Sequence, residues 1–228
     1  MGSGCGLAAC FVGGPRSCVA GGFSLAPAAD RIELGLGAWV RKRYCFGPMD
    51  FGAVLKAVAE EFTRAGIAYA LIGGFAMAAL GVPRATGDLD FLVDGARADD
   101  VDRIMKRLGY QTLHRSPDAA NYTSQSQALG HVDYLFARRP HSRAMLARAK
   151  PRPSLRAHAT VKVVDAEDLI GLKVQSSINN PRRAALDLHD IQRLLEHHPE
   201  LDLDRVREYF RIFEREGDLD RLLAGIKR

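Results

Sequence analysis

The chain has 228 residues, of which 47% are apolar, and it carries a formal net charge of +5 at pH 7. A chain of this length and composition can bury a hydrophobic core and form one or two domains. No run approaches the roughly 18–20 consecutive apolar residues that a membrane-spanning helix needs, so we expect a soluble protein that does not work in a membrane.

Residues 1–48 differ in character from the rest of the chain. Gly and Ala dominate there, apolar periodicity is absent, and no convincing signal-peptide pattern appears. We expect a disordered extension or a translated leader, with Met49 as the functional start. All four cysteines precede Met49, and a body without cysteine suits the reducing cytosol, which predicts a cytoplasmic location.

An amphipathic helix at 50–65 opens the remainder of the chain. Asp50 is its expected N-cap, and its apolar stripe consists of Val54, Leu55, Val58 and Phe62. Further helices are expected at 75–81 and 98–108. The expected strands are 68–72, 88–93, 110–114, 121–124 and 131–136.

The pattern changes after Arg139. Short strands are expected near 153–156 and 160–164, followed by helices at 166–177, 182–196, 203–214 and 218–226. The alternation of helices with a few strands predicts an α+β fold, in which flanking helices cover a small mixed sheet. We expect a core at 49–150 and a mainly helical, substrate-binding region at 151–228.

A glycine pair and two carboxylates follow each other at short range. Gly73 and Gly74 close the strand at 68–72, and main-chain N–H groups without a Cβ in the way can approach a phosphate there. Thirteen residues separate Gly74 from Asp88. Asp88 and Asp90 share one face of the next strand, because residues two apart in a strand point to the same side.

A third carboxylate is expected from a neighbouring strand, where Asp133 lies in the alternating segment 131–136. Acids placed this close repel each other and raise each other's pKa, whereas a hard dication with phosphate oxygens resolves that conflict. We therefore expect Mg²⁺ at Asp88, Asp90 and Asp133. Three acids suffice for two metals about 3.5–4 Å apart that clamp an in-line phosphoryl displacement.

This ordered set resembles a known superfamily. It resembles the motif order of the DNA polymerase β-like nucleotidyltransferases. That order is an apolar residue followed by Gly-Gly, a 13-residue gap, Asp-apolar-Asp-apolar and a later apolar-Asp-apolar. Within that superfamily, residues 72–81, 84–94 and 167–173 look like the small bacterial AbiEii-type toxin nucleotidyltransferases. The resemblance covers roughly residues 49–195 and implies that 49–150 is a nucleotidyltransferase core.

Two other copies of Asp-Leu-Asp serve as a comparison within the chain. They lie at 202–204 and 218–220, and neither follows a Gly-Gly at the right distance. Both precede helical patterns, so we expect helix-capping carboxylates there.

The resemblance also implies that Lys173 contacts phosphate, and the alternative is an ordinary exposed helix lysine. Asp187 and Asp190 match a trailing acidic motif of such proteins. In one interpretation, these two acids orient Lys173, an arginine or the acceptor. In the other, Asp187 pairs with Arg183 one helical turn away.

Residues 137–164 contain many basic side chains and no acid. Such a segment could hold a triphosphate or the backbone of an acceptor RNA, because phosphate contacts give affinity that does not depend on sequence. A solvated basic face is the equal alternative, since no aromatic residues interleave for base stacking. The basic residues are Arg138, Arg139, Arg143, Arg148, Lys150, Arg152, Arg156 and Lys162.

We therefore expect a Mg²⁺-dependent enzyme that moves a nucleoside monophosphate from an NTP such as ATP to an acceptor hydroxyl. The expected catalytic residues are Asp88, Asp90, Asp133 and Lys173. The expected nucleotide-binding residues are Gly73, Gly74, Phe75, Arg84 and Thr86, although Arg84 and Thr86 alternatively only shape the loop.

The resemblance implies a tRNA 3′ end or a protein hydroxyl as acceptor, and a toxin–antitoxin system with a cognate antitoxin. Two alternatives stay open. One is nucleotidylation of a small molecule such as an aminoglycoside, and the other is a nucleotide-binding module that has kept the fold and lost turnover.

Overall fold

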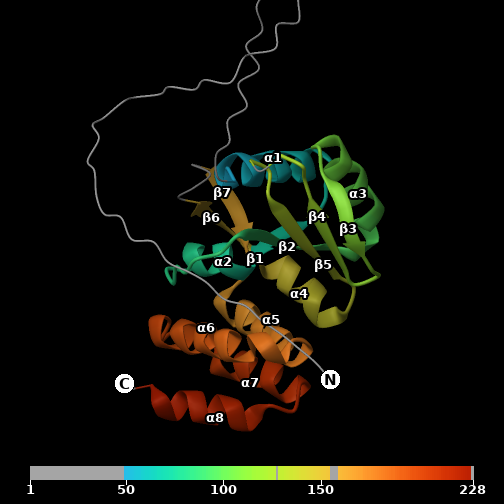
Figure 1. The fold of residues 1–228 in the computed structure, drawn as a ribbon. Coiled ribbons are helices and arrows are strands. Elements are labelled where there is room, and N and C mark those ends of the chain that lie inside the picture. Colours follow the sequence, from blue (N-terminus) through green and yellow to red (C-terminus); the bar gives the residue numbers. More distant parts are fainter. Residues whose placement is uncertain (1–48, 127, 155–158, 227–228) are drawn as a thin grey trace, which may run out of the picture. The chain divides into compact units, whose positions relative to one another are not determined.

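The structure, a computed structural model, describes residues 49–126, 128–154 and 159–226, which all belong to one unit that spans Tyr44–Arg228 (Figure 1). The expected extension or leader at 1–48 lies outside the described residues. In the described ranges, no helix is long and apolar enough to cross a membrane.

A seven-stranded mixed sheet forms the centre of this unit, with the strand order β3-β4-β5-β2-β1-β7-β6. The pairs β2–β5 and β1–β7 are parallel and the others are antiparallel. The strands are β1 (Tyr69–Ile72), β2 (Asp88–Asp94), β3 (Gln111–Arg115), β4 (Ala119–Thr123), β5 (His131–Ala137), β6 (Lys150–Ser154) and β7 (Ala159–Val163).

Helices cover the sheet and continue the chain beyond it. The α-helices are α1 (Phe51–Arg64), α2 (Gly73–Ala79), α3 (Ala98–Arg107), α4 (Pro140–Arg148), α5 (Ala166–Asn179), α6 (Ala184–His197), α7 (Leu203–Ile212) and α8 (Glu216–Gly225). Two 3-10 turns, η1 (Gly95–Arg97) and η2 (Pro181–Arg183), precede α3 and α6. The expected α+β class is confirmed.

One part of the hydrophobic core lies between the sheet and the helices α1 and α3, and the same buried cluster continues into α2, α5, α6 and α7. The ring of Phe62 on α1 lies 6.4 Å from that of Phe91 on β2 and 5.8 Å from that of Tyr134 on β5. From α3, Met105 accepts a hydrogen bond from the Tyr134 hydroxyl at 3.0 Å. Because side chains alternate along a strand, this packing leaves the residues between them, Asp90 among them, on the opposite face of the sheet.

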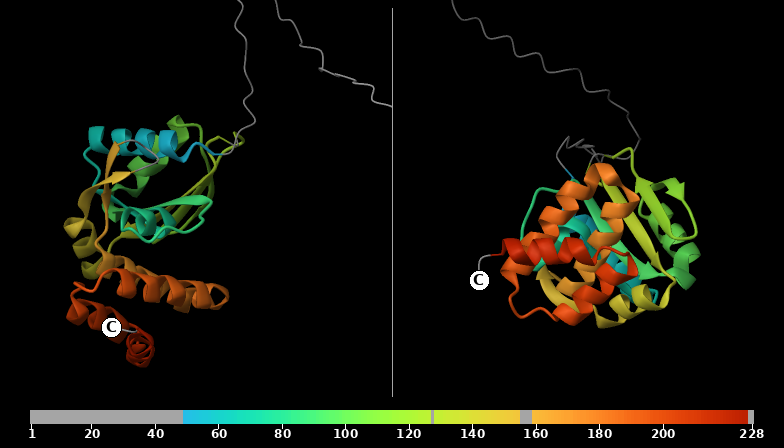
Figure 2. Two further views of the ribbon diagram at one scale, coloured as in Figure 1. Left: turned by 90° about the vertical axis from the view of Figure 1, so that its left-hand side faces the viewer. Right: turned by 90° about the horizontal axis from the view of Figure 1, so that it is seen from below.

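The C-terminal helices α5, α6, α7 and α8 pack on one another on one side of the sheet, as Figures 1 and 2 show from three directions. They include the helical region expected from the sequence. The expected boundary between residues 150 and 151 falls inside β6, so β6 and β7 of the later segment belong to the same sheet as the core.

Most expected elements are present, with shifts of a few residues. Asp50 caps α1 as expected, since its side chain accepts a hydrogen bond from the Ala53 amide. The second helix begins at Gly73, two residues before its expected start, so both glycines belong to its first turn. The possible strand near 121–124 is β4, which begins at Ala119.

Helix α4 was not expected from the sequence. It shows no apolar stripe, and Met145 is its only fully buried side chain. Periodicity therefore gives no signal, and Pro140 at the first helical turn, a favoured position for proline, is the one local cue.

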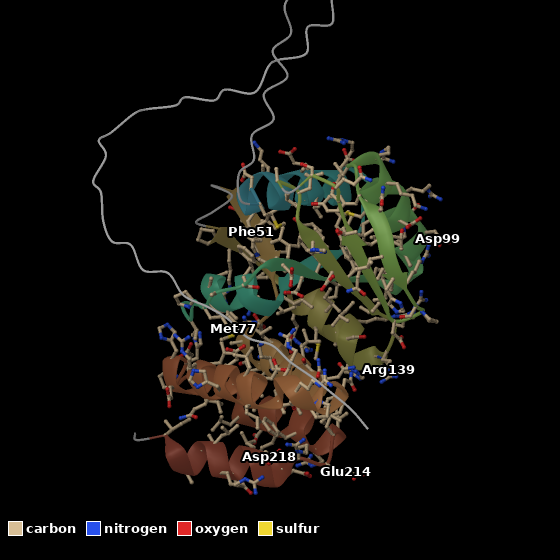
Figure 3. The ribbon with its side chains drawn as sticks, in the orientation of Figure 1. Phe51, Met77, Asp99, Arg139, Glu214 and Asp218 are labelled. Carbon is tan, nitrogen blue, oxygen red and sulfur yellow. The ribbon has the colours of Figure 1, made fainter. Side chains whose placement is uncertain are left out.

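The two expected capping carboxylates differ in outcome. Asp202 caps α7 by accepting hydrogen bonds from the amides of Asp204 and Arg205. The expectation for Asp218 was wrong, because α8 begins at Glu216 and Asp218 lies within its first turn. Asp218 instead pairs with two arginines next to the turn that contains Glu214, a non-glycine residue with positive φ (Figure 3).

Candidate active site

The three expected acids lie on adjacent strands at one end of the sheet. Asp90 on β2 is the direct register partner of Asp133 on β5, and Asp88 is the partner of His131. Leu89 and Phe91 are fully buried on the other face, as the alternating pattern requires. The structure thus brings Asp88, Asp90 and Asp133 onto one face of two paired strands.

Asp90 is the most perturbed of these acids. Burial raises the pKa of its carboxyl from 3.8 to about 6, and the negative charges of Asp133 and Asp88 add to that shift. The cations Lys173 and Arg183 act in the opposite direction. A carboxylate crowded by two others, with cations nearby, is an arrangement that concentrates at functional sites.

Asp133 is held by a neighbour on the next strand. Asn121 on β4 is its register partner, and the Asn121 Nδ2 donates a hydrogen bond of 2.8 Å to Asp133 Oδ1. Burial raises the pKa of Asp133, whereas this hydrogen bond lowers it. Asn121 could not be identified as a site residue from the sequence, because its contact with Asp133 arises only from the strand pairing.

Gly73 and Gly74 make room for side chains of the site itself. Gly73 has φ +65°, and a Cβ there would lie 1.9 Å from Asp90 Oδ2. A Cβ on Gly74 would lie 2.6 Å from the side chain of Thr86. The expected strand–Gly-Gly–helix turn is therefore present, and the carboxylate of Asp90 lies directly against it.

The other expected nucleotide-binding residues surround this turn. The Phe75 side chain is buried and its ring lies 4.8 Å from that of Phe51, so only its main chain faces the turn. Thr86 Oγ1 donates a hydrogen bond of 3.4 Å to the Asp88 carbonyl. Arg84 forms an ion pair with Asp190, with 3.0 Å between Nε and Oδ2. Both residues thus shape the loop before β2.

Lys173 is buried, which excludes the alternative of an exposed helix lysine. Its Nζ donates a hydrogen bond of 3.2 Å to Asp187 Oδ1 and lies 2.6 Å from Asp190 Oδ2. Both carboxylates come from α6 and are buried as well. Asp187 therefore pairs with Lys173 and not with Arg183, and the two acids connect α5, α6 and Arg84.

Arg183, in η2, was expected from the sequence only as a possible partner of Asp187. Its positive charge lowers the pKa of both Asp90 and Asp133. The only sequence signal is its position four residues before Asp187. That position carries no information on β2 and β5, so the electrostatic influence of Arg183 on Asp90 and Asp133 could not be derived from the sequence.

Two basic side chains of the segment 137–164 form ion pairs within the protein. Arg148 donates two hydrogen bonds to the fully buried carboxylate of Asp168, at 3.1 and 2.8 Å. Lys150 Nζ lies 3.0 Å from Asp165 Oδ1. These two cations therefore anchor the start of α5, whereas Arg139 is exposed; Arg156 lies outside the described residues.

The acid face has the ligand chemistry that Mg²⁺ requires. Carboxylate oxygens are hard donors, and Mg²⁺ is usually held by one or two carboxylates together with substrate phosphates. Within the described ranges, no three His, Cys, Asp or Glu side chains form a metal-holding group by themselves.

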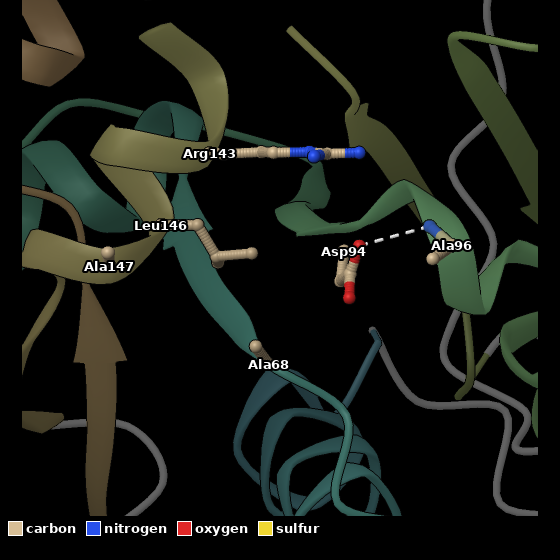
Figure 4. A pocket seen from close by; sticks show the side chains of 6 residues that line it. All are labelled: Ala68, Asp94, Ala96, Arg143, Leu146 and Ala147. Carbon is tan, nitrogen blue, oxygen red and sulfur yellow. Dashed lines mark hydrogen bonds between the residues drawn. The ribbon is translucent and has the colours of Figure 1, made fainter. Parts of the chain in front are cut away.

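A surface pocket of about 390 Å³ lies elsewhere, at the other end of β2. Figure 4 shows Arg143 and Asp94 on its rim, with the Asp94 carboxylate accepting a hydrogen bond from the Ala96 amide. Asp94 and Asp88 stand at opposite ends of the strand, roughly 20 Å apart along it. This pocket is distinct from the acid face.

The fold and the acid face agree with a nucleotidyltransferase. The chain belongs to a family described as "Uncharacterised nucleotidyltransferase", whose model matches residues 51–213. The match includes the glycine turn, all three acids and the Lys173 cluster. A comparison with curated proteins found no match.

Two solved structures of the antibiotic-resistance factor ANT(2'')-Ia share this fold. One, determined in solution, has a TM-score of 0.53 and 16% identity, and it covers 74% of this chain and 94% of that chain. The other is a crystal structure in complex with adenylyl-2''-tobramycin, with a TM-score of 0.52, 14% identity, and coverage of 71% of this chain and 95% of that chain.

Proposed function

We propose that this protein transfers a nucleoside monophosphate from an NTP to an acceptor hydroxyl in a Mg²⁺-dependent reaction. The observation that carries the proposal is the register of Asp90 with Asp133, beside Asp88 and the Gly73 turn, in a chain of a nucleotidyltransferase family. Three carboxylates on one face would be costly without a cation and a phosphate ligand.

The proposed reaction is an in-line displacement. The acceptor oxygen forms a bond to the α-phosphorus, the bond from that phosphorus to the bridging oxygen breaks, and pyrophosphate leaves. Asp88, Asp90 and Asp133 would hold Mg²⁺, which when bound offsets the charge of the phosphates. Asp133, oriented by Asn121, would accept the proton of the acceptor hydroxyl.

The nucleotide would lie against the turn at the start of α2. The main-chain N–H groups of Gly73, Gly74 and Phe75 are proposed to face its phosphates. Thr86 and Arg84 would support this turn through their loop contacts. Positioning and charge stabilisation would supply most of the rate, since phosphoryl transfer needs little covalent chemistry from the protein.

Lys173 is proposed to contribute positive charge next to Asp90. It is held between Asp187 and Asp190, so direct contact with a phosphate requires it to exchange at least one of these partners. Its position in the buried cluster supports a role in fixing α5 and α6 at the acid face.

Two classes of acceptor are proposed. The resemblance to AbiEii-type proteins favours a tRNA 3′ end or a protein hydroxyl. The internal ion pairs of Arg148 and Lys150 favour a small alcohol instead, because they remove two cations from the proposed RNA contact. A toxin role, a cognate antitoxin and a cytoplasmic location stay predictions.

The proposal is tested by incubating the full chain with each labelled NTP, Mg²⁺ and one acceptor class at a time. The acceptors are bulk tRNA, the protein itself and a panel of aminoglycosides. Label should move to one class, and both EDTA and Asp88→Asn should abolish the transfer. Absence of label from every acceptor, together with measurable NTP binding, would favour the non-catalytic module.

A further inference from the structure

Residues 80–87 connect α2 to β2 and so join the two halves of the proposed site. They follow the helix that begins with the glycine turn, and they end directly before Asp88. Residues 82–86 belong to no helix or strand. A segment without a regular hydrogen-bond ladder keeps one position only if other elements hold it.

The end of helix α6 holds the first part of this connection. His198, the C-cap of α6, donates a hydrogen bond of 2.8 Å from Nε2 to the Leu80 carbonyl. The ring of His197 lies beside Gly81, where a Cβ would be 2.5 Å from the His197 Nε2. Gly81 has φ +82°, a conformation that favours glycine, so the turn and the close approach both depend on the missing side chain.

Two charged side chains of α6 hold the middle of the connection. Arg193 Nη1 donates a hydrogen bond of 3.1 Å to the Pro83 carbonyl. One turn earlier, Asp190 Oδ2 lies 3.0 Å from Arg84 Nε. Because positions 190, 193 and 197 are spaced by three and four residues, they share one face of the helix. The connection therefore runs along a single face of α6, in the opposite direction.

The last part of the connection touches both halves of the site. The Thr86 side chain packs so closely on the glycine turn that a Cβ on Gly74 would lie 2.6 Å from it. The Thr86 hydroxyl donates a hydrogen bond of 3.4 Å to the Asp88 carbonyl. A displacement of the connection would thus move Asp88 relative to the glycine turn.

We propose that α6 positions Asp88 relative to the glycine turn by holding residues 80–87, and that Arg193 is a positioning residue for the reaction. The inference rests on the proposed function, in which Asp88 is a ligand of Mg²⁺. Asp190 also lies 2.6 Å from Lys173 Nζ, whereas Arg193 forms no ion pair among the described residues. Substitution of Arg193 therefore tests the hold on the connection without disturbing the buried cluster.

The test compares Arg193→Ala with Arg211→Ala, a matched control that removes the same charge from an exposed position on α7. Hydrogen exchange of the full chain, without Mg²⁺ or NTP, reports on the amides of residues 84–87. Arg193→Ala should speed their exchange about 3- to 10-fold, as expected for the loss of one hydrogen bond. Arg211→Ala should leave it unchanged. Arg193→Lys keeps a donor for the Pro83 carbonyl and should recover part of the protection.

Steady-state transfer from labelled ATP is measured on the same variants, with whichever of tRNA, protein or aminoglycoside takes the label. Arg193→Ala should lower kcat about 10- to 100-fold, the effect of misplacing a reacting group by up to about 1 Å. The KM for ATP should change by less than about threefold. A merely structural contact would lower the melting temperature and leave kcat unchanged.

Unchanged exchange in Arg193→Ala would overturn the inference whether or not the protein is a transferase. Faster exchange with an unchanged kcat would overturn the positioning role and leave the proposed function intact. Absence of transfer by the wild type would overturn the proposed function, and with it the role of Arg193 in the reaction, whereas faster exchange would still show that α6 holds the connection.

Discussion

Asp90 and Asp133 are directly paired across the parallel strands β2 and β5. Each has neighbours that fix its position, since Asp90 lies against Gly73 and Asp133 accepts a hydrogen bond from Asn121. A pair of carboxylates anchored from both sides cannot relieve its repulsion by moving apart. The site therefore keeps an unfavourable charge arrangement that a cation would relieve.

Replacing either β2 acid should remove activity and leave the fold intact. Asp88→Asn and Asp90→Asn each delete a proposed metal ligand while keeping the side-chain shape, so NMP transfer should fall by at least about 10³-fold. Transfer is measured at saturating Mg²⁺ and NTP, with thermal unfolding as the check on folding. Full activity in either variant would exclude these residues as ligands.

The stability of the metal-free protein should depend on pH through Asp90. Its pKa is raised from 3.8 to about 6 in the folded state, so the unfolded chain ionises first as the pH rises. This contribution favours folding below pH 4, falls between pH 4 and 6, and is constant above that range. The loss is on the order of 3 kcal/mol.

The measurement is the difference in urea unfolding between wild type and Asp90→Asn from pH 3.5 to 7.5. The variant should gain stability relative to wild type as the pH rises through the window. The control is Asp204→Asn, because the Asp204 side chain is 97% exposed. A pH-independent difference for Asp90→Asn would contradict the raised pKa.

The buried cluster around Lys173 should be important for stability. Lys173→Met leaves Asp187 and Asp190 buried with Arg84 as their one remaining counter-charge among the described residues, and breaking a buried pair costs about 3–5 kcal/mol. The control is Lys56→Met, whose pair with Glu60 is exposed and should contribute under about 1 kcal/mol. Chemical denaturation measures the free energy of unfolding of both variants. Equally small losses in the two variants would contradict a stabilising role of the Lys173 cluster.

Substitutions in the basic segment 137–164 should have two different effects, on stability for paired residues and on RNA binding for exposed ones. Arg148→Ser should destabilise the fold, because within the described ranges it leaves the buried Asp168 carboxylate with the Tyr209 hydroxyl as its one side-chain donor. For RNA contact, the informative variant replaces Arg139, Arg143 and Lys162 with Ser. If these residues bind an RNA backbone, the salt slope of binding should fall by about one per lost phosphate contact.

NTP binding is the control for that triple variant, and it should not change. An unaltered salt-dependent affinity for RNA would identify the segment as a solvated face. It would then leave a small molecule or a protein hydroxyl as the better acceptor.

Removal of residues 1–48 should leave the enzyme unchanged. The first helix of the described residues is α1, whose capping residue Asp50 and apolar stripe lie after Met49. A protein that starts at Met49 should match the full chain in melting temperature and in NTP transfer. A marked drop in either would show that residues 1–48 contribute to the folded enzyme.

The parts of the site that follow from local pattern could be predicted from the sequence. Asp88 and Asp90 follow from the period of a strand, and Asp133 from an alternating segment with the same character. Long-range pairing could not be derived in this way. The partners Lys173 and Asp190, or Arg148 and Asp168, meet only because separate helices pack together. Helix α4 was missed because it has no apolar stripe.

The outer strands of the described sheet limit how the protein can associate with other chains. In β6, Pro151 and Pro153 have no N–H to offer a further strand. In β3, the register shifts between Thr112 and His114, which interrupts a regular ladder. Neither edge presents a long, uniform row of free donors and acceptors. Growth of the sheet into fibrils or edge-to-edge aggregates is therefore disfavoured, even though Leu113 on β3 is exposed.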